Sequence, residues 1–600
     1  MNLCYQILWH NQADYMAHWI NDLLQESGAR GRVLRTDEAI IIDAQGDGAT
    51  LDRLADSLRL RLPHSLFLGD ASPLQNLPEN TRALAPRAMP EGLFVLPQTA
   101  QKLLDRQNPD YFNLFLGCEA AGVRPIESAT LKLGGIVSTV NPQNCETLFN
   151  QMAQYLQSGQ TLHFQTGRGT LALSAHPLPD RPVFVLVAHT RLLETWQLSQ
   201  EAFMRLSAVE KPALTLPCPA DEAPFFGAAE LQLPFDIPTL LLCKALQEAG
   251  LDAVYAVGTQ TAPDFSFEGG QRSLERLVIA ELPQGFAVLK GNAALFPKRL
   301  KGPKSTALGL CEDMGALWDN GSILIGPADR LPAHPVSRLN TVGQNPNASH
   351  PDTVLIDSAQ AAVLSVLVEH GLHNEKAVAA HLAWDDPQSG VLVFDPKSGF
   401  KRVSGISPVP QSGKAVIAAL EGMDETAPVL LGNIRQKFPG LLETIETKSF
   451  APTPRSLFGL LGLLCGLKAE DEALLTHALL APTYGEGCKG GVKIDFKTDA
   501  DRQIDWRWCA RTLLSFRMAD VPASVLIPSI FESFCDWLVV RLGELRTGVG
   551  TPVIAVSGDL SASPIVAQKL HDHFGRFFKL RYNQELPVQG ANQALGALYL

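Results

Sequence analysis

The first 70 residues alternate between strand-like and helix-like patterns of apolar positions. The run Leu3–Trp9 predicts a strand, and Ala13–Leu24 places its large apolar side chains on one helical face. A second strand is predicted at Ile40–Ala44, followed by a helix with apolar positions from Leu51 to Leu58. Ser65–Leu68 then closes the unit. This order predicts an α+β sandwich of the ferredoxin-like type over residues 1–70.

The rest of the chain divides by composition and pattern into three further segments. Residues 71–130 begin with a stretch rich in Pro, Asn and Ser, which predicts a linker, and continue with short irregular patterns. Strands and helices alternate over residues 131–304, which predicts an α/β domain with a mixed sheet. Residues 305–600 predict two lobes, so the whole chain is expected to combine α/β and α+β domains.

The clearest elements lie near the C-terminal end of the chain. Pro552–Val556 predicts a buried strand that ends in the turn Ser557-Gly558-Asp559. Pro564–Phe574 and Gly590–Leu600 predict helices, with a strand between them. The run Ser524–Leu542 is long enough to cross a bilayer, but it carries Glu532 and Asp536, so a buried or amphipathic helix is predicted instead.

Charge and cysteine spacing exclude several classes of protein. The net charge of −12 and the lack of a dense basic run argue against a nucleic-acid partner. The N-terminal residues lack the basic and apolar stretches of a signal peptide, and no membrane association is expected. The ten cysteines contain no CxxC pair, which argues against a zinc site of ordinary spacing and favours reduced thiols in the cytoplasm.

Several segments resemble one family of enzymes. SFAPTPRSLFGLLGLLCGL (449–467), AVSGDLSASPIVAQKL (555–570) and LPVQGANQALGALYL (586–600) resemble parts of HypF, the carbamoyltransferase of nickel–iron hydrogenase maturation. ARGRVLRTDEAIIIDAQGD (29–47) is similar to the second half of an acylphosphatase, and LQSGQTLHFQTGRGTLAL (156–173) is similar to part of a YrdC-like domain.

The resemblance implies four units: an acylphosphatase-like domain, paired zinc modules, a YrdC-like domain, and a two-lobed actin-like ATPase fold. It also implies an activity in which ATP converts carbamate to a carbamoyl adenylate and the carbamoyl group passes to a partner's C-terminal cysteine. ATP is therefore the implied cofactor, and proteins of hydrogenase maturation are the implied partners.

The N-terminal functional sites of that family have lost most of their characteristic residues in this chain. The phosphate loop would fall near His10–Met16, which has no Gly and no Arg, and Arg35 stands where the family has its water-positioning Asn. In the zinc-module remnant within residues 71–130, Cys118 occupies a ligand position, but Ala121 replaces a second thiolate.

The functional sites of the YrdC-like domain and of the C-terminal domain also lack characteristic residues of the family. The basic helix of the YrdC-like domain is missing, and Arg181 and Lys211 remain as rim charges or substrate ligands. The three metal positions of the C-terminal domain read Ser358, Ala362 and Gly590, so zinc and other metals are expected to be absent.

Some nucleotide-binding positions persist. Asp385 aligns with the aspartate of the phosphate-binding turn, and Ser557, Gly558 and Asp559 retain a turn where an adenine nucleotide would lie. An ordinary strand-to-helix turn explains the last three equally well.

Three functions stay open. The first is a HypF-like protein that is catalytically inactive or strongly altered and acts by protein binding, as a scaffold, chaperone or regulator. The second is an active ATP-dependent carbamoyltransferase with relocated ligands, drawn from Asp357, His350, His381 and Asp385. The third is a nucleotide-binding ligase or sensor. No catalytic residue is assigned.

Overall fold

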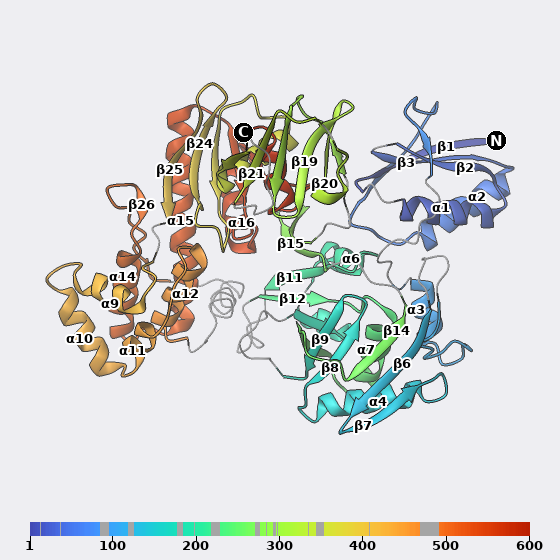
Figure 1. The fold of residues 1–600 in the computed structure, drawn as a ribbon, viewed down its shortest axis with the longest axis horizontal. Helices are drawn as coiled ribbons and strands as arrows, with labels where there is room; N and C mark the ends of the chain where they lie inside the picture. Colours follow the sequence, from blue (N-terminus) through green and yellow to red (C-terminus); the bar gives the residue numbers. More distant parts are fainter. Residues whose placement is uncertain are drawn as a thin grey trace.

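The computed structural model contains four β-sheets that follow one another along the chain (Figure 1). It describes residues 1–600 except 12–13, 37, 85–94, 96, 118–124, 177–183, 197, 218–227, 271–275, 284, 292–295, 297, 334, 344–352, 407–408 and 468–490. The N-terminal sheet with its helices lies at the upper right of Figure 1, and the second sheet lies below it. The two C-terminal sheets lie side by side at the top, above a group of helices at the lower left.

The N-terminal sheet has the ferredoxin-like order β4-β1-β3-β2, extended by the short strand β5. Both helices pack on one face of this sheet (Figure 1). The elements are β1 (Asn2–Trp9), α1 (Tyr15–Ser27), β2 (Arg30–Arg35), β3 (Ala39–Gln45), α2 (Gly48–Arg61), β4 (Leu68–Pro73) and β5 (Arg82–Ala83). The ferredoxin-like prediction is confirmed, with one strand, β2, that the apolar pattern did not indicate.

Local chemistry explains where these elements begin and end. Gly28 ends α1 in the left-handed conformation, with φ +80°, which a residue with a side chain adopts at a cost. Gly31 lies so close to β3 that a Cβ there would stand 2.1 Å from the Asp43 carbonyl oxygen. Asp47 caps α2 by accepting the Thr50 N–H.

The second sheet runs from Ile126 to Lys290 and mixes parallel and antiparallel pairs, as predicted. Its strand order is β16-β15-β11-β12-β10-β13-β9-β8-β14-β6-β7. The strands are β6 (Ile126–Leu133), β7 (Ile136–Val140), β8 (Leu162–Thr166), β9 (Gly169–Ser174), β10 (Phe184–Val187), β11 (Ala213–Pro217), β12 (Ala228–Gln232), β13 (Ala253–Gly258), β14 (Phe265–Gly269), β15 (Val278–Leu282) and β16 (Gly285–Lys290). The helices of this region are α3 (Pro97–Leu104), α4 (Cys145–Gln157), α5 (Arg191–Thr195), α6 (Gln200–Ser207) and α7 (Ile237–Glu248).

The two C-terminal sheets repeat one topology. Three antiparallel strands are extended by two parallel strands, in the orders β20-β19-β18-β21-β22 and β25-β24-β23-β27-β28. The first sheet also holds β17 (Lys298–Leu300), with β18 (Ala307–Cys311), β19 (Met314–Asp319), β20 (Ser322–Pro327), β21 (Arg338–Val342) and β22 (Thr353–Ile356). The second holds β23 (Ala377–His381), β24 (Gly390–Asp395), β25 (Gly399–Ile406), β26 (Gln503–Ile504), β27 (Val553–Ser557) and β28 (Lys579–Arg581). This duplication confirms the predicted two lobes.

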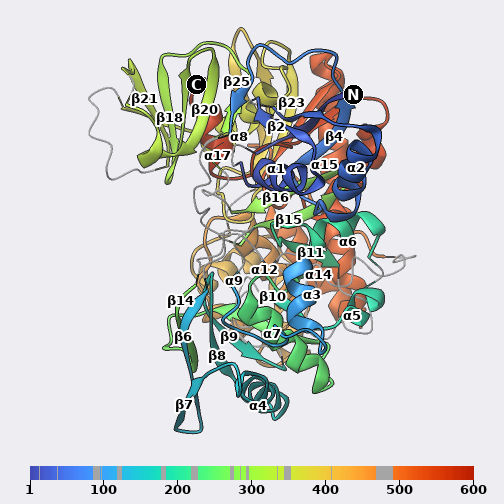
Figure 2. The ribbon, with the colours of Figure 1, turned by 90° about the vertical axis from the view of Figure 1, so that its right-hand side faces the viewer.

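Two helices join the lobes. The helices α8 (Ser358–Glu369) and α17 (Ala591–Ala597) share one apolar core with residues from both C-terminal sheets. Successive residues of β23 serve different cores: Ala377 and Ala379 face this shared core, while Val378 and Ala380 face a second core. Figure 2 shows α8 and α17 beside β18 and β20 from another side.

The second core lies between the last sheet and a helical group. It contains residues of α9 (Gly413–Glu421), α10 (Ala427–Lys437), α11 (Leu441–Glu446), α12 (Pro454–Leu464), α14 (Trp506–Met518), α15 (Ala523–Val549) and α16 (Pro564–Leu570). Among the described residues, α15 is long and apolar enough to cross a membrane by length and composition, but 56% of its most apolar window is buried inside the fold. Its packing in this core accounts for its apolar sequence.

Candidate functional site

A cleft of about 1090 Å³ opens where the second sheet meets the two C-terminal lobes. The end of β16 forms one wall, the turn between β18 and β19 forms another, and the β23–β24 loop and the starts of α8 and α17 complete it. Its charged and polar lining residues are Lys290, Cys311, Glu312, Asp313, Asp357, Ser358, Asp385, Asp386, Gln388, Gln589 and Gln593. The cleft is therefore wide, and charged and polar groups share its lining with apolar side chains.

The three positions that the sequence resemblance assigns to the family's metal ligands lie at or beneath this cleft. Ser358 and Gly590 line it, at the starts of α8 and α17. Ala362 is fully buried within α8, in the apolar interior of the fold. A hydroxyl, a methyl and a hydrogen do not supply the imidazole and carboxylate ligands of such a metal, so the residues present do not fit it. Within the described ranges, no three His, Cys, Asp or Glu side chains are grouped as metal ligands would be.

Asp385 lies at the exposed rim of the cleft. Its side chain is 66% exposed and accepts two hydrogen bonds from Arg455 of α12, at 2.5 Å from Nε and 2.7 Å from Nη2. The backbone N–H of Arg455 also donates to the Trp384 carbonyl oxygen at 2.9 Å. This pair therefore ties the β23–β24 loop to the helical group.

The turn at 557–559 packs and makes hydrogen bonds within the protein, and it is not among the residues that line the cleft. Ser557 is fully buried. Gly558 has φ +90°, and a Cβ there would stand 2.2 Å from the Leu382 carbonyl oxygen. Asp559 accepts the Trp384 N–H at 2.9 Å, and burial raises the pKa of its carboxyl above the usual value. These three residues hold the end of β27 against the β23–β24 loop.

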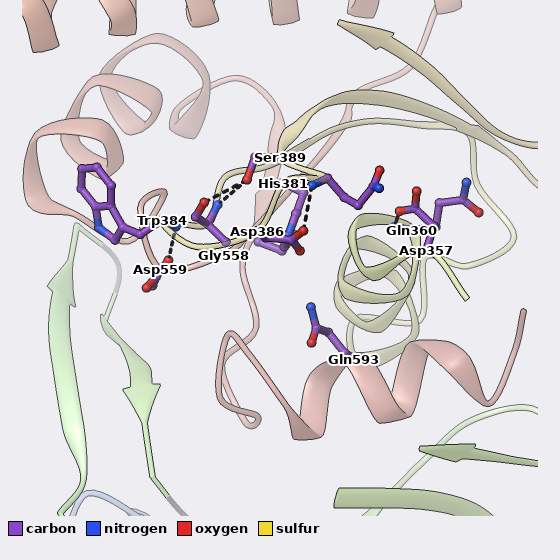
Figure 3. A network of polar contacts seen from close by, with 12 residues as sticks. Asp357, Gln360, His381, Trp384, Asp386, Ser389, Gly558, Asp559 and Gln593 are labelled. Atoms are coloured by element: carbon purple, nitrogen blue, oxygen red, sulfur yellow. Dashed lines mark hydrogen bonds and ion pairs between the residues drawn. The ribbon is translucent and has the colours of Figure 1, made fainter. Parts of the chain in front are cut away.

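Beside the cleft, a hydrogen-bonded chain links Ser557, His381 and Asp386. Figure 3 shows His381 and Asp386 next to each other. The His381 Nδ1 atom lies 2.9 Å from the Ser557 hydroxyl oxygen, and the Nε2 atom lies 2.9 Å from Asp386 Oδ2. His381 is fully buried, whereas Asp386 lines the cleft. Burial raises the pKa of the Asp386 carboxyl, but hydrogen bonds from His381, Ser358 and the Gln388 N–H outweigh it and hold this pKa below its usual value.

Carboxylates outnumber cations along the cleft. Of the five that line it, Asp357 pairs with Arg402 at 3.2 Å and Asp385 pairs with Arg455. Within the described part of the chain, Glu312 and Asp313 make no ion pair. Among the described lining residues, Lys290, from the second sheet, is the one lysine or arginine. An anionic ligand would thus meet its main attraction at Lys290.

Other residues considered from the sequence lie elsewhere. Arg35 is fully buried, donating from Nε to Asp14 at 3.0 Å and from Nη2 to the Asn11 carbonyl oxygen at 2.8 Å. Lys211 lies on a turn with φ +45° and donates to the Ser207 carbonyl oxygen at 3.3 Å. The positions that fall outside the described residues are Cys118, Ala121, Arg181 and His350.

Sequence patterns missed two polar groups of the cleft. Asp386 directly follows Asp385, and only the fold shows that Asp386, rather than Asp385, contacts His381. Lys290 belongs to a different sheet from the lobes it faces, so no local motif marks it.

The fold and the cleft define a multidomain protein in which a ferredoxin-like domain and a mixed-sheet domain precede a duplicated two-lobed domain. No protein-family model matches the chain, and no curated protein matches it by sequence. Two crystal structures share the whole architecture, and both are of HypF. Full-length HypF in its phosphate- and nucleotide-bound form has a TM-score of 0.66, and HypF of T. kodakarensis has a TM-score of 0.69. Each is 12% identical and covers 100% of this chain and 98% of its own length.

The chain therefore has the fold of full-length HypF. This confirms the expected α/β and α+β multidomain architecture, with two lobes in the C-terminal half.

Proposed function

We propose that this chain is a HypF-like protein of nickel–iron hydrogenase maturation that acts by protein binding, as a scaffold, chaperone or regulator, without transferring carbamoyl groups. The observation that carries the proposal is the composition of the metal positions. Ala362 is fully buried and Gly590 has no side chain, so neither supplies a ligand at the place where the resemblance puts the metal.

The hydrogen bonds that Ser557 and Asp559 make within the protein support the same conclusion. Ser557 bonds to His381 and Asp559 bonds to the Trp384 backbone, so both polar side chains stabilise the protein itself. We place the protein in the cytoplasm, with the proteins of hydrogenase maturation as its partners.

The size and polarity of the cleft favour a second candidate, a nucleotide-binding sensor. A cleft of about 1090 Å³ is large enough for a nucleotide. Lys290 would hold its phosphates, and Asp385 at the rim would contact it after releasing Arg455. HypF itself has been crystallised with nucleotide bound.

Two measurements on the purified full chain separate these functions. Isothermal titration with Mg·ATP, alone and with carbamoyl phosphate, reads out nucleotide binding, and metal analysis reads out stoichiometric metal. The scaffold proposal predicts no nucleotide binding and no stoichiometric metal. It also predicts direct binding to the purified partner whose C-terminal cysteine accepts the carbamoyl group. Binding of Mg·ATP that is weakened in Lys290→Met, but not in the exposed control Lys132→Met, would favour the sensor. Stoichiometric metal with carbamoyl-phosphate-dependent binding would contradict both.

A further inference from the structure

His381 connects the interior of the last lobe to the cleft. It ends β23 and lies opposite Ser557 at the end of β27, in a parallel pair that also joins the Leu382 N–H to the Ser557 carbonyl oxygen at 2.9 Å. Both side chains are fully buried. A buried imidazole with two partners has one fixed orientation, because turning the ring would break both hydrogen bonds.

The partners also fix which ring nitrogen carries the proton. An ionised carboxylate only accepts hydrogen bonds, so Nε2–H must donate to Asp386. In the neutral ring Nδ1 is then an acceptor, and the Ser557 hydroxyl donates to it. The direction of donation is therefore from Ser557 to His381 and from His381 to Asp386.

Asp386 uses most of its acceptor capacity inside the protein. Its Oδ2 atom accepts from His381, its Oδ1 atom accepts the Gln388 N–H at 2.8 Å, and the Ser358 hydroxyl also donates to the carboxylate. A carboxylate has about four acceptor positions, so about one remains. The side chain is 15% exposed and lines the cleft, which leaves that position to a ligand.

We propose that Asp386 is a ligand-binding residue of the cleft that accepts a hydrogen bond from an N–H or O–H group, and that His381, fixed by Ser557, is its positioning residue. The ligand is a small molecule with amide, amidine, amine or hydroxyl donors. This goes beyond the proposed function, which concerns only the protein surfaces that bind a partner: here the cleft also binds a small molecule.

Imidazole NMR tests the positioning role without any ligand. In the full chain labelled with ¹⁵N-histidine at pH 7, the signal lost in His381→Gln is assigned to His381. A single tautomer is expected, with Nε2 protonated and Nδ1 bare, and Asp386→Asn should shift the Nε2 signal. Averaged nitrogen shifts, or a proton on Nδ1, would overturn the proposal.

Methylguanidinium, a planar donor cation that pairs with carboxylates, tests the binding role. Ligand-observed NMR at millimolar concentration should show saturable binding that falls at least tenfold in Asp386→Asn and in His381→Leu. His381→Gln, whose side-chain amide is also a donor, should restore part of it, and the exposed control Asp52→Asn should match the wild type.

Equal binding by wild type and Asp386→Asn, or no binding by the wild type, would overturn the ligand-binding role of Asp386. Both readouts are independent of carbamoyl transfer, so this proposal and the proposed function fail separately.

Discussion

Tyr15 of the N-terminal domain donates a hydrogen bond to Glu210 of the second domain, with 2.6 Å between the Tyr15 hydroxyl oxygen and Glu210 Oε1. The Ser65 hydroxyl donates to the same oxygen, and the Leu66 N–H donates to Oε2 at 3.0 Å. Glu210 is buried, and it thus receives three donors from the neighbouring domain. This carboxylate joins two domains that form separate sheets.

Removing the Tyr15 hydroxyl should loosen this junction. Tyr15→Phe deletes one donor to a buried carboxylate, which costs about 2 kcal/mol for a hydrogen bond to a charged group. Thermal unfolding should show an earlier first transition. The matched control is Tyr155→Phe, because the half-buried Tyr155 hydroxyl makes no hydrogen bond within the described residues. Equal shifts in the two variants would contradict the role of Tyr15.

The same carboxylate predicts a pH dependence. Burial raises the pKa of Glu210 above its usual value, although hydrogen bonds from Ser65, Tyr15 and Leu66 oppose this. The folded state then holds a proton more tightly than the unfolded state, so the contribution of Glu210 to stability is largest below the ordinary pKa of 4.5 and declines as the pH rises through the folded pKa.

Glu210→Gln cannot titrate, so it provides the reference. The free energy of unfolding of the wild type, minus that of Glu210→Gln, should fall as the pH increases from about 4.5 and then level off. Denaturant unfolding of both proteins between pH 4 and pH 8 measures this difference in the free energy of unfolding. A difference that increases with pH would show that the folded pKa is lowered instead.

The contact between α8 and α17 predicts a steric effect. A Cβ on Gly596 of α17 would stand 1.7 Å from the Ala361 carbonyl oxygen of α8, which forces the helices apart. Gly596→Ala should therefore destabilise the lobes by about 1–3 kcal/mol, as overpacking does.

A second helical glycine provides the control. Apart from the backbone of α15 itself, no atom of the described residues lies within 4 Å of a Cβ on Gly543, so Gly543→Ala should stabilise the protein by up to about 1 kcal/mol through helix propensity alone. Differential scanning calorimetry of the two variants should give shifts of opposite sign. A stabilising Gly596→Ala would mean that α8 and α17 do not pack this closely.

Periodicity predicted the ferredoxin-like domain well, because most of its elements have one apolar face. It missed β2, where the residues Arg30–Arg32 are exposed and Val33–Arg35 are buried, a pattern that matches no simple alternation. The predicted linker likewise contributes to the sheet, since β4 extends to Pro73 and β5 pairs with β2.

The candidate site was harder to predict because its contacts join distant parts of the chain. His381 and Ser557 are 176 residues apart, and they meet only because β23 and β27 pair in parallel. The duplicated topology of the two C-terminal sheets also leaves no internal sequence repeat, since apolar residues of many kinds satisfy the same strand positions.

Pyrophosphate release by the purified full chain, supplied with Mg·ATP and carbamoyl phosphate, tests the central claim most directly. Formation of a carbamoyl adenylate from ATP must release pyrophosphate. With Ser358, Ala362 and Gly590 at the positions where the resemblance puts the metal, the expected result is release no greater than in a sample without protein. Release that requires both substrates and exceeds that background would contradict the account, and would show that this fold carries out the chemistry with other residues.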